Sequence, residues 1–129
     1  MFRKRLKDPL PEEIRRAFSM AAGLVDEAQR ALIAAVPTSR NPGVSLADAL
    51  EAFLAALQTL ERAMPAWRDD RVAHEWTKCS DGILQARDQA EALRRYDAEL
   101  TFEQLNARVG DILYPLEAFA DAERDLRRR

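Results

Sequence analysis

The side chain best suited to acid–base chemistry in this chain belongs to His74, the only histidine among 129 residues. An imidazole titrates near neutral pH, so His74 can both donate and accept a proton. Arg68 precedes it with five residues between the two, and a guanidinium there could stabilise negative charge that develops on a phosphate. The pair suggests cleavage of a phosphate ester. The alternative is that His74 is a surface or capping residue near the start of a helix.

The segment from Arg68 to His74, RDDRVAH, resembles the Arg-x4–6-His motif of the HEPN superfamily of four-helix proteins. Asp69 fills the acidic position that typically follows the arginine in that motif. The resemblance implies a metal-independent ribonuclease in which Arg68 and His74 are catalytic. It also implies a dimer, so that two copies of the motif face one RNA.

Residues that bind metals or cofactors are few and scattered. One cysteine and one histidine cannot form a Cys/His zinc cluster, and no Glu-x-x-His pair is present for a di-iron site. The glycines stand singly, so the sequence contains no glycine-rich phosphate loop. Cys79 falls at an apolar helix position, where we expect a buried structural thiol. The sequence therefore predicts no metal and no cofactor.

The elements that position these residues are predicted to be helices. Four segments repeat apolar residues at alternating steps of four and three, which is typical of helices packed side by side. These segments predict helices over 11–36, 46–64, 70–97 and 102–127, joined by short connections. We therefore predict an all-α fold: an up-and-down antiparallel four-helix bundle with left-handed packing, forming a single domain over 1–129.

Local signals support these helix boundaries. Thr101 with Gln104 has the form of a capping box, and Asp69 or Asp70 can cap the third helix. Pro115 removes a backbone N–H inside the last helix, so we expect a kink there.

The predicted topology gathers basic residues at one end of the bundle. The net charge is −2, but Arg3, Lys4, Arg5 and Lys7 carry four positive charges at the start of the chain. The start, the connection between the second and third helices and the end of the chain lie together in this topology. The sequence thus predicts a basic pole for an anionic partner, formed with Arg62, Trp67, Arg68, Arg71, Arg127 and Arg128. Trp67 either stacks on a partner's bases or closes the core.

Four residues fall at a similar height in the predicted bundle: Gly23, Phe53, Gly82 and Pro115. Residues that weaken helices at one level let helices approach closely. They could also leave a mid-bundle pocket for a small apolar ligand.

We predict a non-enzymatic binding or protein-interaction module, with an unknown protein or anionic partner. The alternatives are the HEPN-like ribonuclease, which would bind nucleic acid, and a carrier of a small apolar ligand. No export signal or membrane-spanning run is recognisable, so we expect a cytoplasmic protein without a membrane partner. Both a monomer and a homodimer are compatible with the sequence.

Overall fold

The computed structural model describes residues 10–36, 46–96 and 99–128. The helices are α1 (Glu12–Ala34), α2 (Leu46–Ala63), α3 (Ala73–Arg95), α4 (Phe102–Leu113) and α5 (Glu117–Arg127). Short 3-10 helices lie between some of them: η1 (Met64–Trp67), η2 (Asp70–Val72) and η3 (Tyr114–Leu116). No strand occurs in these ranges.

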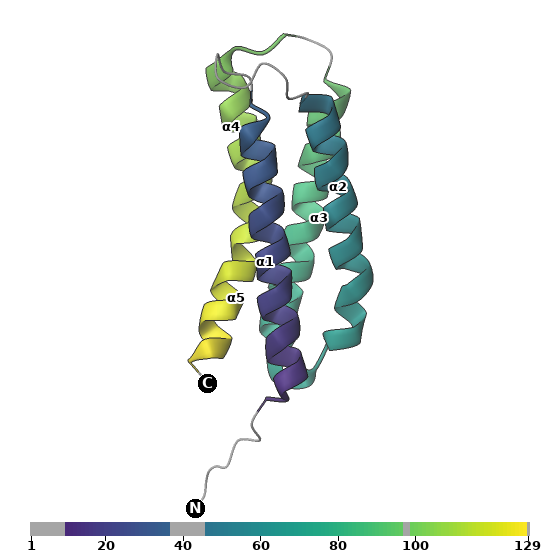
Figure 1. The fold of residues 1–129 in the computed structure, drawn as a ribbon, viewed down its shortest axis with the longest axis vertical. Coiled ribbons are helices and arrows are strands. Elements are labelled where there is room, and N and C mark those ends of the chain that lie inside the picture. The colour runs from purple at the N-terminus through teal and green to yellow at the C-terminus, as the bar shows by residue number, and fades with distance from the viewer. Residues whose placement is uncertain (1–9, 37–45, 97–98, 129) are drawn as a thin grey trace, which may run out of the picture.

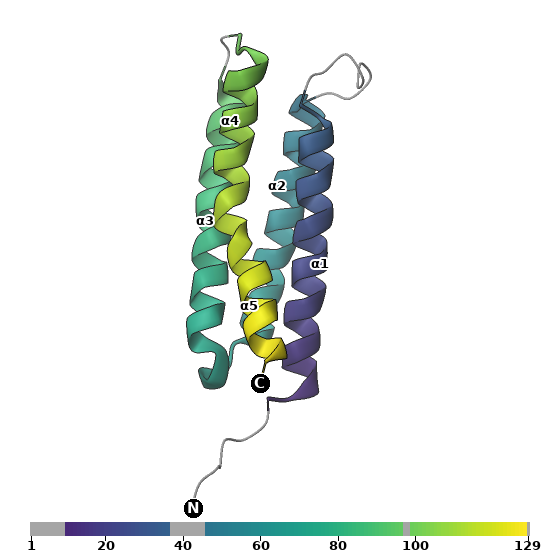
Figure 2. The ribbon, with the colours of Figure 1, turned by 90° about the vertical axis from the view of Figure 1, so that its left-hand side faces the viewer.

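The helices form the predicted up-and-down four-helix bundle (Figure 1). α1 packs on α2 and α5, while α3 packs on α2, α4, η3 and α5. The fourth arm of the bundle therefore consists of α4, η3 and α5 in succession, which run antiparallel to α3 (Figure 2). None of the helices in the described ranges combines the length and the apolar character needed to cross a lipid bilayer.

The core follows the apolar spacing of the sequence. Each arm of the bundle contributes side chains that are almost wholly buried, among them Phe18, Leu57, Ile83 and Phe119. The Trp67 ring meets the Phe18 ring edge-on, with the centroids 4.6 Å apart. Aromatic pairs in this geometry add to the stability gained from apolar burial.

The last predicted helix, over 102–127, is interrupted where Pro115 stands. Proline has no backbone N–H to continue the helical ladder, and the chain passes through the tighter η3 turn before α5 begins. The capping box at Thr101 is confirmed: its hydroxyl accepts from the Gln104 N–H at 3.1 Å, and Gln104 Oε1 accepts from the Thr101 N–H at 2.9 Å.

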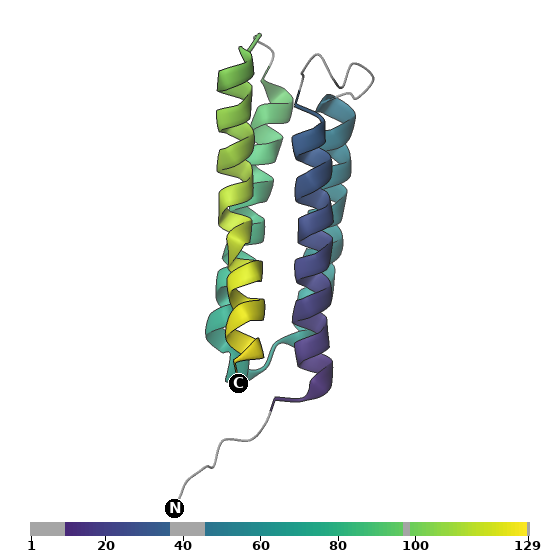
Figure 3. The same ribbon diagram turned by 60° about the vertical axis from the view of Figure 1, so that its left-hand side comes forward.

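The third helix begins later than its predicted start at residue 70, because Asp70–Val72 forms η2 before α3 begins at Ala73. It also ends slightly earlier than residue 97, at Arg95. The start of α1, the η1–η2 corner and the end of α5 lie at the same end of the bundle (Figure 3). We call this end the corner pole.

Candidate functional site

The η1–η2 corner is fixed by an aspartate cap. Asp69 Oδ1 accepts from the backbone N–H of Arg71 at 2.8 Å and from Arg71 Nε at 2.9 Å. A second bond joins Arg71 Nη2 to Asp69 Oδ2 at 2.9 Å. The Arg71 side-chain hydrogen bonds, followed by its backbone N–H, lower the pKa of Asp69 to about 2. The Arg71 guanidinium is thus engaged by a carboxylate of its own chain.

Arg68 has different surroundings. Its guanidinium carbon lies over the Trp76 ring, 5.0 Å from the ring centroid, which is within the range of a cation–π interaction. The Trp76 indole N–H donates to the Met64 carbonyl at 2.8 Å, and this bond fixes the ring against the end of α2. Within the described part of the chain, the Arg68 guanidinium forms no hydrogen bond or ion pair. Arg68 is thus an exposed residue whose guanidinium is held on one flat face by Trp76.

Trp67, the other tryptophan of the corner, points inward. It is only 8% exposed and packs on Phe18 in the core. Of the two roles considered from the sequence, its placement fits closing the end of the core.

The remaining predicted basic residues differ in their surroundings. Arg127 pairs with Glu123 at 3.4 Å, whereas Arg62 and Arg128 are exposed. Arg15 of α1 donates to the Leu126 carbonyl near the end of α5. Arg3, Lys4, Arg5 and Lys7 lie outside the described residues. In the described residues the charge at the corner pole is therefore mixed. Arg68 differs from the other arginines there because it stacks on Trp76.

His74 lies on another surface, in a groove between the start of α3 and α5. Lys78 lines this groove from α3, and Asp121 and Asp125 line it from α5. Arg68 does not line this groove, and its guanidinium lies over Trp76 instead. A catalytic role for this pair stays a prediction.

The four residues predicted for a mid-bundle pocket separate into three settings. A Cβ atom at Gly82 would overlap the carbonyl oxygen of Pro115, so these two positions touch. Phe53 is buried in the core. Gly23 is exposed, and a Cβ there would meet no atom within 4 Å. Gly82 and Pro115 are brought together, whereas Gly23 faces outward from α1.

Cys79 is buried, as expected from the apolar spacing. Burial, with the nearby charges of Glu75 and Asp121, raises the pKa of its thiol to about 12. The thiol is therefore protonated, and unreactive as a nucleophile, at ordinary pH.

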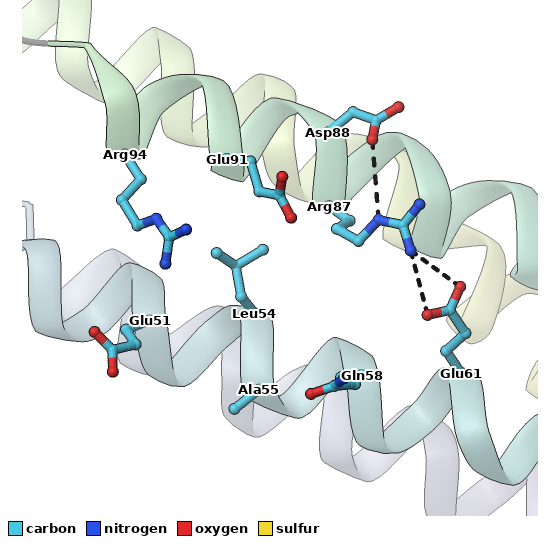
Figure 4. A pocket seen from close by; sticks show the side chains of 9 residues that line it. All are labelled: Glu51, Leu54, Ala55, Gln58, Glu61, Arg87, Asp88, Glu91 and Arg94. Atoms are coloured by element: carbon cyan, nitrogen blue, oxygen red, sulfur yellow. Dashed lines mark hydrogen bonds and ion pairs between the residues drawn. The ribbon is translucent and has the colours of Figure 1, made fainter.

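A further hollow, of about 550 Å³, lies between α2 and α3 (Figure 4). Arg87 crosses it to Glu61, with its Nη1 3.3 and 3.2 Å from the two carboxylate oxygens. Glu91, which also lines the hollow, pairs with Arg95 at 3.6 Å. Most charges here compensate one another, and we interpret the hollow as a salt-bridged surface between two helices.

Comparison with family models, with curated proteins and with solved structures finds no match for this chain. In the described ranges, no three His, Cys, Asp or Glu side chains are grouped so that they could hold a metal ion. The functional interpretation therefore depends on the geometry of the molecule itself.

Proposed function

We propose that this all-helical protein is a non-enzymatic binding module that holds an anionic partner at its corner pole. The single observation that supports the proposal is the guanidinium of Arg68, held over Trp76 without a carboxylate partner in the described chain. Arg62, in the last turn of α2, and Arg128, directly after α5, are exposed and would add to the attraction.

Stacking on Trp76 lowers the conformational entropy that Arg68 loses when it binds a ligand. A free arginine side chain must lose conformational freedom when it binds a ligand, which weakens binding. The Trp76 face restricts the Arg68 side chain before a ligand arrives. The planar N–H edge of a guanidinium matches the two oxygens of a phosphate or carboxylate.

Arg71 and Arg127 have a supporting role in this proposal. Each already pairs with a carboxylate, Asp69 and Glu123 respectively. An anion that bound them directly would compete with that carboxylate. They contribute to the local potential, whereas Arg68 contacts the partner.

The test is a binding titration with Arg68→Gln. Fluorescence anisotropy would follow two labelled probes, a short single-stranded oligonucleotide and an oligo-glutamate peptide, which represent phosphate and carboxylate partners. We expect the variant to bind the preferred probe about three- to tenfold more weakly, as expected for loss of an exposed charge-assisted contact.

Arg30→Gln is the matched control, because it removes the same charge from α1 at an exposed pair with Asp26. The control should change affinity by less than about twofold. Equal weakening by the two variants would mean that net charge alone determines binding, and it would contradict a site at Arg68. The same oligonucleotide, inspected for cleavage, would show whether the ribonuclease alternative applies.

A further inference from the structure

A second surface of interest lies on the α3 side of the bundle, between α3 and the η3–α5 arm. Two hollows of about 310 and 330 Å³ lie between α3 and the η3–α5 arm. They share Lys78, Ala118 and Asp121, so they lie next to each other along α3, and we call the two together the α3–α5 groove. His74 lies at one end of the groove and Tyr114 at the other.

Small residues explain why this groove is open. Gly82, Ala118 and Ala122 line its length and have little or no side chain to fill it. At Gly82 the backbone of α3 lies directly against the Pro115 carbonyl of η3, so no space is left between the two elements at that position. The groove therefore has small residues at its base, between α3 and the η3–α5 arm.

The walls of the groove carry an excess of negative charge. Four exposed carboxylates line it, against the two cationic side chains of Lys78 and Arg124, and Arg124 is already paired with Asp121. The carboxylates are Asp81, Glu117, Asp121 and Asp125. A ligand complementary to these walls carries positive charge.

Tyr114 supplies an aromatic contact at the end of the groove. It is 73% exposed, although its backbone is held by the bond from its N–H to the Gly110 carbonyl at the end of α4. Tyrosine is enriched among residues that dominate protein interfaces, and its ring face attracts guanidinium groups. This molecule already makes such contacts, with Arg108 over Tyr96 at 4.9 Å.

From these observations we infer that the α3–α5 groove binds a short basic peptide segment of a partner protein. His74 and Gln85 mark its extent along α3, a distance of about 17 Å at the rise of an α-helix. An extended peptide of about five residues covers that distance. Its basic side chains meet the carboxylates of the walls, and an arginine stacks on Tyr114. None of the arginines proposed for the anionic partner lines this groove, so separate variants test the two proposals.

The test uses the full chain and a fluorescein-labelled oligo-arginine peptide, with oligo-glutamate as the opposite-charge peptide. The variant Asp81→Lys/Glu117→Lys reverses two exposed wall charges and should weaken binding of oligo-arginine about fivefold or more. Tyr114→Ser should weaken it separately, because it removes the ring and leaves the charge unchanged. Circular dichroism would verify that each variant is folded.

Glu27→Lys/Glu51→Lys is the matched control, since it makes the same change in net charge at exposed positions on α1 and α2. We expect it to alter the affinity by less than about twofold. Equal weakening by both double variants, unchanged binding by Tyr114→Ser, or no saturable binding of oligo-arginine would each overturn the inference. Because Arg68→Gln leaves this groove intact, its effect on anionic probes reports on the corner pole alone.

Discussion

Gly82→Ala tests how α3 packs against the η3 break. Alanine inside a helix normally stabilises it by about 0.5–1 kcal/mol relative to glycine. At this position, however, the added Cβ would overlap the Pro115 carbonyl oxygen, a backbone atom that cannot swing aside. Overpacking of this kind costs about 1–3 kcal/mol. The overpacking cost outweighs the helix gain, and the middle of the two ranges gives an expected net loss of about 1 kcal/mol in the free energy of unfolding.

Urea unfolding followed by circular dichroism measures this loss. Gly23→Ala is the matched control, because it places the same methyl group on an exposed position of α1 with no atom within 4 Å. There we expect a gain of about 0.5–1 kcal/mol. The substitutions should therefore shift stability in opposite directions. A Gly82→Ala protein as stable as the wild type would refute the close packing of α3 on η3.

Three further predictions concern the corner and the buried thiol. Trp76→Phe removes the indole N–H that bonds to the Met64 carbonyl, and we expect unfolding experiments to show a loss of about 1–2 kcal/mol. The Cys79 thiol should react slowly with Ellman's reagent at pH 8 in the folded protein and rapidly in urea. Because its folded pKa of about 12 exceeds that of an exposed thiol, stability should fall as pH rises from about 9 towards 12, and Cys79→Ala should lessen that fall. The pKa of Asp69 is lowered from 3.8 to about 2, so its contribution to stability is present above pH 3.8 and is lost as pH falls towards 2. Acid titration of Asp69→Asn, followed by circular dichroism, should show a smaller loss of stability over that interval than the wild type shows.

The fold could be predicted because its signals are local. The apolar steps of four and three place Phe18, Leu57, Ile83 and Phe119 in the core, where the structure has them. A proline inside a helix lacks the backbone N–H of the helical ladder and its ring clashes with the preceding turn, so it marks a break. Pro115 lies in the break at η3.

The candidate sites were less predictable, because they depend on how each helix is rotated about its axis. Gly23 illustrates this limit. Its height in the bundle is similar to that of Gly82, which predicts a shared pocket. However, Ala21 and Val25, two residues away on either side, are both buried. A residue two positions away points to the opposite side of a helix, so this spacing could have placed Gly23 outward.

The stack of Arg68 on Trp76 had no comparable sequence signal. It depends on two 3-10 turns, η1 and η2, that set the path of the chain between α2 and α3. The exposed Tyr114 had a partial signal, because it directly precedes the predicted kink at Pro115.

The most direct test of the proposed function is a side-chain NMR titration of the full chain with the preferred anionic probe. Arginine Nε–H and tryptophan Nε1–H resonances would be followed together. We predict that the Arg68 and Trp76 resonances shift together and saturate with the probe, while the Arg30 resonance on α1 stays in place. Saturation without a shift at Arg68, or equal shifts of all arginine resonances, would contradict the proposal.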